Sequence, residues 1–276
     1  MRRLFEFVKF EHTLFSLPLL LAGALLAARR MPPLEPLAWV VIAGTGARTL
    51  AMALNRIIDR KIDAANPRTA GRELPSGSMS LAQGWLVAAA GLVVFYAAIA
   101  RLPELCLWLS PIPLAIFALY PFLKRFTYLA HFGVGAGLAF GPIGAYVAIA
   151  GEPPGDAAVY WLAAFTWLWV GGFDVIYATL DEEFDRHARL HSIPARFGRP
   201  RALVIAAVVH GIALGCLAVL TARFLAGPLA WSAWAVVGGM LVLEHHQVRR
   251  VDFAFFRVNA ALGFVVLGLV WFGVRG

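Results

Sequence analysis

The sequence NRIIDRKID, residues 55–63, ends a long apolar segment that begins near residue 35. Asn55, Asp59 and Asp63 recur at every fourth residue, so on a helix they lie along one face. Carboxylates at the end of a membrane-length helix are costly unless they are paired, hydrated or bound to a metal ion. The stretch therefore predicts a polar site at the end of an apolar helix.

A second acidic stretch, DVIYATLDEEFD at residues 174–185, also ends a long apolar segment. Asp174, Tyr177, Asp181 and Asp185 are spaced i, i+3, i+7 and i+11, which predicts a second polar face on one helix. The last three of these overlay the polar residues of 55–63 at a constant offset. This predicts a pseudo-repeat, about 10–125 and 127–250, that brings the two faces opposite each other.

Composition identifies the environment of the chain. Of its 276 residues, 61% are hydrophobic and 14% are charged, whereas soluble domains carry about a quarter charged residues. We therefore expect an integral membrane protein whose partner is the lipid bilayer. The net charge of +8 does not indicate a nucleic-acid partner, because the basic residues are confined to short connections between apolar runs.

The apolar runs predict an all-α, polytopic membrane protein with nine transmembrane helices. A span needs about 20 apolar residues. One membrane domain, residues 1–276, would contain the pseudo-repeat and a ninth helix at 253–274. The expected helices are 12–29, 35–58, 81–100, 104–120, 127–149, 157–180, 200–222, 228–246 and 253–274.

Charge predicts the orientation of these helices. Of the 24 Lys and Arg, 18 fall on the predicted side of the N-terminus, five fall on the opposite side, and Arg48 lies within a span. Because cytoplasmic connections are enriched in Lys and Arg, we expect the N-terminus and both acidic stretches to face the cytoplasm. The protein would be a multi-pass protein of the cell (plasma) membrane, or inner membrane.

Carboxylates on two facing helices, surrounded by basic residues, suit a diphosphate carried by Mg²⁺. Mg²⁺ prefers oxygen ligands and bridges carboxylates to phosphate oxygens. Arg72, Lys124 and Arg68 would take the remaining phosphate charge. The membrane setting gives this diphosphate a long apolar tail.

These residues resemble the two signatures of the UbiA superfamily of intramembrane prenyltransferases. The first comprises residues 55–63 followed by RELPSG at 72–77, and the second comprises residues 174–185 followed by HSIP at 191–194. Arg48 matches an arginine of the 4-hydroxybenzoate branch, and Tyr120 with Lys124 matches the Tyr-x3-Lys after the fourth helix. The resemblance covers nearly the whole chain, including the count of nine helices.

The resemblance implies Mg²⁺-dependent transfer of a polyprenyl group from its diphosphate to an electron-rich aromatic ring in quinone biosynthesis. The metal ligands would be Asn55, Asp59, Asp63, Asp174, Asp181 and Asp185. Metal and basic residues would stabilise the leaving diphosphate, and Tyr177 and Tyr120 would face the developing cation. Asp181 or Asp185 would remove a proton from the acceptor or the arenium intermediate, and both assignments stay open.

The aromatic acceptor would be a carboxylic acid, oriented by Arg48 about 10 Å deeper along the helix than Asn55. Lys9 is a further candidate for substrate binding. The sequence FEHTLF at 10–15 and HSIPARFG at 191–198 resemble members assigned to menaquinone made by the futalosine route. The acceptor is therefore expected to be 4-hydroxybenzoate or a dihydroxynaphthoate.

Two alternatives remain from the sequence. Within the same class, the acceptor could be haem, chlorophyllide or a lipid, and Arg48 is the residue that discriminates the aromatic carboxylic acid from these alternatives. In another class, the chain could be a transporter with acidic cation sites. Transporters place such carboxylates near the bilayer midplane, whereas here they lie at the ends of spans, which argues against transport.

Overall fold

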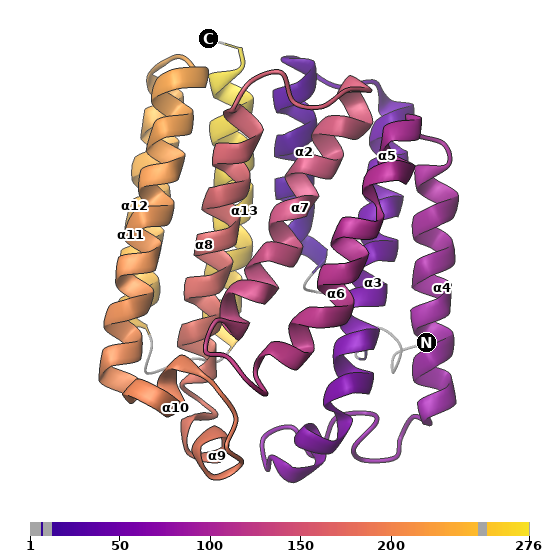
Figure 1. The fold of residues 1–276 in the computed structure, drawn as a ribbon. Helices are drawn as coiled ribbons and strands as arrows, with labels where there is room; N and C mark the ends of the chain where they lie inside the picture. Colours follow the sequence, from indigo (N-terminus) through magenta and orange to yellow (C-terminus); the bar gives the residue numbers. More distant parts are fainter. Residues whose placement is uncertain (1–6, 8–12, 248–252, 276) are drawn as a thin grey trace.

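The computed structural model describes residues 7, 13–247 and 253–275, in which the chain is helical and no strand occurs. Figure 1 shows the long helices running side by side as one bundle, with two short helices at its lower end. The helices are α2 (Thr13–Ala28), α3 (Leu34–Ala65), α4 (Leu81–Ile99), α5 (Glu104–Leu109), α6 (Pro111–Leu123), α7 (Ala130–Ala150), α8 (Ala158–Ala178), α9 (Glu182–His187), α10 (Ile193–Phe197), α11 (Arg199–Phe224), α12 (Pro228–His246) and α13 (Phe253–Gly273).

The described helices occupy the nine expected ranges with two differences. Helix α3 runs seven residues beyond the expected end at residue 58. It continues through Asp59 and Asp63 and ends at Ala65. The range 104–120 is divided at Ser110 into α5 and α6, because Pro111 has no amide hydrogen to continue the ladder. The pseudo-repeat stays a prediction.

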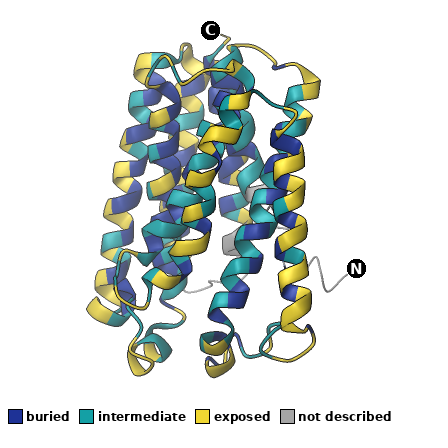
Figure 2. Cartoon of the chain, turned by 45° about the vertical axis from the view of Figure 1, so that its right-hand side comes forward, coloured by how far each residue is buried: buried dark blue, intermediate teal, exposed yellow. Residues whose placement is uncertain are grey.

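Six helical segments of the described chain are long and apolar enough to cross a membrane, so the number nine is not confirmed. They are α3, α4, Glu104–Leu123 (which combines α5 and α6), α7, α8 and α11. Their outer faces carry large exposed apolar side chains such as Leu86, Trp108 and Val204, and Figure 2 shows exposed positions along the outside of the bundle. The protein is a multi-pass membrane protein whose apolar surface suits contact with lipid.

Helix α8 lies in the core of the bundle, together with residues of α2, α11, α12 and α13. Its Leu162, Phe165 and Trp169 are fully buried, and they belong to one core cluster with residues of α2, α11, α12 and α13. The Phe165 and Trp169 rings are stacked, with centroids 5.6 Å apart. The core therefore fixes the position of the helix that leads into the second acidic stretch.

Helix α7 contacts α8 closely because Gly135 lacks a side chain. A Cβ at Gly135 would lie 2.2 Å from the Trp167 carbonyl oxygen, closer than any real contact. Small residues allow membrane helices to approach in this way. The close approach places His131, one turn before Gly135, beside the part of α8 that carries Asp174.

Candidate active site

The polar residues of the first stretch lie on one continuous helix, α3, as predicted. The Asn55 Nδ2 atom donates a hydrogen bond to Asp59 Oδ2 at 3.2 Å, which confirms that the two side chains stack along one face. Asp59 and Asp63 are buried, with exposed fractions of 3% and 5%. Buried carboxylates require partners.

Basic side chains provide those partners. The Lys124 Nζ atom lies 2.6 Å from Asp59 Oδ2. The Arg72 Nη1 atom contacts both oxygens of Asp63, at 2.8 and 2.9 Å. Arg125 adds a weaker contact, with Nη2 4.0 Å from Asp59 Oδ1. The structure therefore brings Arg72 and Lys124 to the carboxylates of α3.

The second stretch does not form one helical face, and that expectation is wrong. Helix α8 ends at Ala178, and Asp181 is the residue before α9. Tight i→i−3 hydrogen bonds replace the α-helical ladder from Thr179 to Asp181, as is common at helix ends. Three acidic residues in the first turn of α9 then favour a new helix N-terminus there.

The loop after α3 connects the two acidic stretches. The Arg68 Nε atom donates to Asp181 Oδ1 at 2.8 Å, its Nη2 atom donates to Asp181 Oδ2, and its Nη1 atom donates to the Tyr177 hydroxyl at 3.0 Å. Asn66 Nδ2 also donates to Asp181 Oδ1 at 2.8 Å. Burial alone would raise the pKa of Asp181, but the hydrogen bonds from Arg68 and Asn66 outweigh it and lower that pKa. Arg68 thus holds the two stretches together and keeps Asp181 ionised.

A histidine that the sequence reasoning missed is the partner of Asp174. The His131 Nδ1 atom lies 2.7 Å from Asp174 Oδ2, and the backbone N–H of Ile193 donates to His131 Nε2 at 3.2 Å. Because Nε2 accepts a hydrogen bond, the proton of the neutral ring resides on Nδ1 and is donated to Asp174. His131 therefore links α7, α8 and the segment before α10.

Asp185 lies on α9, near the other members of the second stretch. It is hydrogen-bonded to Ser192, and burial raises its pKa above the ordinary value. The backbone N–H of His191 donates to the Lys124 carbonyl oxygen at 2.7 Å. The segment at 191–194 therefore connects Asp185, His131 and Lys124.

Arg48 and Tyr120 lie deeper in the bundle and interact electrostatically with each other. Tyr120 also interacts with Asp59 and Asp174 and is hydrogen-bonded to Asn55. The Arg48 Nε atom is buried and has no hydrogen-bond partner among the described residues. A buried donor without a partner is costly, so this atom is a candidate for binding a ligand.

Two residues of this set were not signalled by the sequence reasoning, and one predicted residue cannot be placed. Asn66 follows Asp63 by three residues, so extending the polar pattern into the loop would have found it. His131 stands alone in the apolar run of α7, and no spacing marks it. Lys9 lies outside the described residues.

The donor chemistry of the site fits Mg²⁺. It consists of carboxylate and amide oxygens, the hard ligands that Mg²⁺ prefers. The buried Oδ1 atom of Asp59 has no hydrogen-bond partner in the described part of the chain. Each of Asp59, Asp63 and Asp181 is engaged by a basic side chain, and no three His, Cys, Asp or Glu of the described residues converge as a ready metal site.

Residues 16–272 match the model of the UbiA prenyltransferase family. The chain belongs to this family. It is 30% identical over 227 residues to the 4-hydroxybenzoate octaprenyltransferase of Pseudomonas aeruginosa (strain UCBPP-PA14), covering 82% of this chain and 76% of that protein. It is 32% identical over 226 residues to the enzyme of the same name from Pseudomonas putida (strain W619), covering 78% and 73%.

Solved structures of the family share the fold. The apo structure of a UbiA homologue from Aeropyrum pernix K1 has a TM-score of 0.84 and 36% identity, covering 93% of this chain and 95% of that one. A UbiA homologue from Archaeoglobus fulgidus bound to DMAPP and Mg²⁺ has a TM-score of 0.73 and 17% identity, covering 98% and 99%. The chain is a prenyltransferase, and the transporter alternative is not retained.

Proposed function

We propose that this prenyltransferase transfers a polyprenyl group from its diphosphate to the ring of an aromatic carboxylic acid in a Mg²⁺-dependent reaction. One observation carries the proposal. The carboxylates of α3 and of the α8–α9 segment, far apart in the sequence, both pair with arginines of the connection after α3. Arg72 binds Asp63, and Arg68 binds Asp181. Such a cluster suits a ligand with several negative oxygens and divalent cations.

The basic side chains would bind the diphosphate. Arg68, Arg72 and Lys124 are all partly exposed, at 32%, 29% and 28% of their side chains, so a ligand can reach them. Their donors stabilise negative charge on the leaving diphosphate as the C–O bond breaks. Bound Mg²⁺, held by Asn55, Asp59, Asp63, Asp174 and Asp181, would add a Lewis acid for the same charge and leave Asp185 without a metal ion.

Aromatic rings would stabilise the allylic cation. Arg68 Cζ lies 5.0 Å from the centroid of the Tyr177 ring, so this ring already faces a positive charge. Tyr120 contacts the polar face of α3 through Asn55. Cation–π contacts of this kind contribute about 0.5–2 kcal/mol each.

Asp185 is our choice for the base that removes the proton from the acceptor or the arenium intermediate. Arg68 holds Asp181 ionised and lowers its pKa, whereas burial raises the pKa of Asp185. A carboxylate with a raised pKa is the better proton acceptor of the two.

Arg48 is the residue that would orient the carboxylate of the acceptor. Its buried Nε has no hydrogen-bond partner among the described residues, and guanidinium groups bind carboxylates in a bidentate manner. The printed names of the two Pseudomonas relatives favour 4-hydroxybenzoate as that acceptor. A dihydroxynaphthoate is the second candidate, and the site would face the cytoplasm in either case.

The test uses purified protein, Mg²⁺, farnesyl diphosphate and a panel containing 4-hydroxybenzoate and dihydroxynaphthoates, with products identified by mass. We expect a prenylated aromatic acid that disappears with EDTA and in Asp59→Asn and Asp181→Asn. Glu183→Gln is the matched control, because Glu183 is an exposed carboxylate of α9, and it should retain activity. Full activity of both aspartate variants would refute the proposal.

A further inference from the structure

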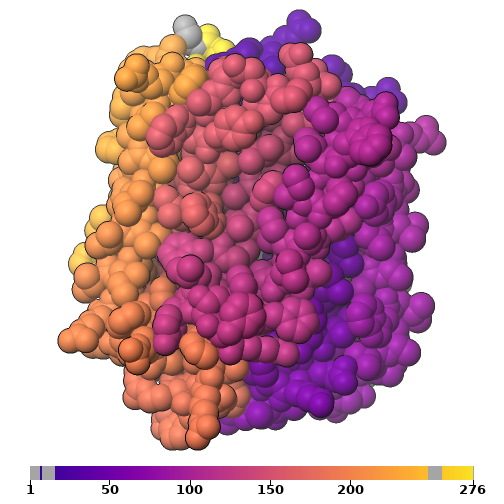
Figure 3. Space-filling view, in the orientation of Figure 1, coloured from indigo at the N-terminus to yellow at the C-terminus, as the bar shows by residue number. Residues whose placement is uncertain are grey.

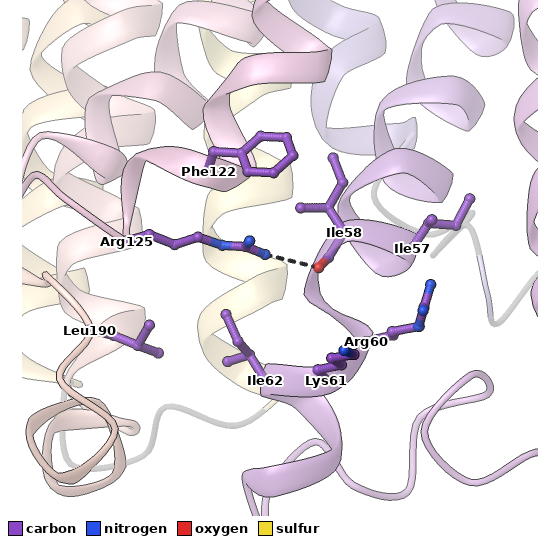
Figure 4. Close-up of a pocket in the computed structure, with 8 residues that line it drawn as sticks. All are labelled: Ile57, Ile58, Arg60, Lys61, Ile62, Phe122, Arg125 and Leu190. Atoms are coloured by element: carbon purple, nitrogen blue, oxygen red, sulfur yellow. Dashed lines mark hydrogen bonds between the residues drawn. The ribbon is translucent and has the colours of Figure 1, made fainter.

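A separate pocket lies beside the carboxylate site, on the neighbouring face of α3. It has a volume of about 510 Å³ and is lined by Ile57, Ile58, Arg60, Lys61, Ile62, Phe122, Arg125 and Leu190. We call it the basic groove. Figure 4 shows Phe122 and Arg125 on one side of it and Arg60 and Lys61 on the other. In the space-filling view the α3, α6–α7 and α9–α10 segments meet at the lower part of the molecule.

The basic groove combines two kinds of surface. Three of its eight residues are cationic, none is acidic, and the other five are apolar. Neither Arg60 nor Lys61 forms a salt bridge or a hydrogen bond that uses its side chain within the described part of the chain. The groove thus offers uncompensated positive charge next to an apolar wall, which suits an anionic amphiphile.

Arg125 is fixed at the wall of this groove. Its Nη2 atom donates to the Ile58 carbonyl oxygen at 3.0 Å, and its guanidinium lies 4.9 Å from the centre of the Phe122 ring. The side chain is 41% exposed, so its remaining donors are accessible. A guanidinium held in this way is preorganised for a phosphate oxygen.

The depth of the groove matches the headgroup region of a bilayer. From Leu34, the first residue of α3, to Ile58 a helix rises about 36 Å, whereas the hydrocarbon core is about 30 Å thick. With the start of α3 at one boundary of the hydrocarbon core, Ile58 therefore lies near the opposite boundary, where acyl chains and headgroups meet. Basic pockets between membrane helices at this level bind anionic lipid headgroups.

We propose that the basic groove binds an anionic phospholipid. Its phosphate contacts Arg60, Lys61 and Arg125, and its acyl chains extend along Phe122 and Ile58. The groove shares only Arg125 with the carboxylate site, through the 4.0 Å contact with Asp59. The proposal does not depend on the acceptor or on the transfer reaction.

The test measures lipid retained by the purified full-length protein from mixed micelles of phosphatidylglycerol and phosphatidylcholine, counted by native mass spectrometry. We expect the wild type to prefer phosphatidylglycerol and the double variant Arg60→Gln/Lys61→Gln to lose that preference roughly tenfold or more, since each charge near an anionic lipid contributes about fivefold. Arg196→Gln/Arg201→Gln removes the same charge from exposed positions near the same end and should behave as wild type.

Three outcomes would overturn the proposal. The first is equal loss in both double variants, which indicates attraction to overall charge. The second is unchanged retention in Arg60→Gln/Lys61→Gln. The third is displacement of phosphatidylglycerol by inorganic phosphate or by farnesyl diphosphate without Mg²⁺, which indicates a free anion or the diphosphate substrate as the occupant. Circular dichroism of each variant checks that the helices remain folded.

Discussion

Lys124 Nζ lies 2.6 Å from Asp59 Oδ2, and this contact joins the segment after α6 to the buried polar face of α3. Asp63 and Asp181 are paired in the same manner with Arg72 and Arg68. Each of these pairs joins two parts of the chain. The first joins the end of α6 to α3, the second joins α3 to the connection that follows it, and the third joins that connection to the segment before α9. The basic residues that would bind the diphosphate thus also neutralise the carboxylates of the site in the absence of substrate.

Lys124→Met should destabilise the metal-free protein, because it leaves Asp59 buried without its counter-ion. The expected loss is about 1–3 kcal/mol, measured by thermal unfolding in detergent. The double variant Lys124→Met/Asp59→Asn should recover most of that stability without recovering prenyl transfer. Lys61→Met, which removes an exposed lysine of α3, is the control. A double variant no more stable than Lys124→Met would contradict the pairing.

His131→Phe should lower transfer activity about 10–100-fold, the usual cost of removing a residue that orients a metal ligand. The ring would lose its hydrogen bond to Asp174 and leave the Ile193 N–H without an acceptor. The Mg²⁺ concentration for half-maximal activity should rise as well, which a purely structural role would not produce. His246→Phe, at an exposed position of α12, should change neither quantity.

Asp185→Asn should stabilise the metal-free protein at pH 7. Burial raises the pKa of Asp185 in the folded state, so ionisation at neutral pH opposes folding, and the amide removes that cost. The difference in melting temperature from wild type should shrink as the pH falls toward the folded pKa, because both proteins are then neutral at this position. A difference that persists unchanged at acidic pH would contradict the assignment. Transfer activity should fall in the same variant.

Arg48→Gln should raise the KM for carboxylated acceptors roughly tenfold or more, since a hydrogen bond to a charged group contributes about 1.5–3 kcal/mol. The KM for the prenyl diphosphate should change little, because Arg48 lies deeper than the carboxylates. Steady-state kinetics with both substrates varied would measure the two effects separately. Equal loss with acceptors that lack a carboxylate would assign Arg48 a structural role instead.

Cysteine labelling in whole cells tests the orientation, in a background with Cys106 and Cys216 replaced by Ala. Ser76→Cys, in the connection after α3, should react only with a membrane-permeant reagent. Glu152→Cys, in the connection after α7 at the opposite end of the bundle, should react with an impermeant one. Both positions are exposed. The reverse pattern would place the carboxylates outside the cytoplasm.

The site of α3 was predictable because it is local. Asn55, Asp59 and Asp63 need only helical periodicity to share a face, and α3 is continuous through them. The second stretch has a similar helical spacing, but the single helical face predicted from it was wrong. A turn after Ala178 places Asp181 and Asp185 beyond the end of α8. Spacing alone cannot reveal such a turn, because Asp181 is held by Arg68 and Asn66 from another part of the chain.

The sequence by itself determined the apolar helices, the two acidic stretches and the family signatures, because hydropathy and spacing are properties of neighbouring residues. Only the tertiary structure decided which basic residue neutralises each carboxylate, and that His131 holds Asp174 from 43 positions away. It also decided that Arg60, Lys61 and Arg125 line one groove. The physical reason is that ion pairs and hydrogen bonds act over a few ångströms in space, so helix packing selects the partners that share a site.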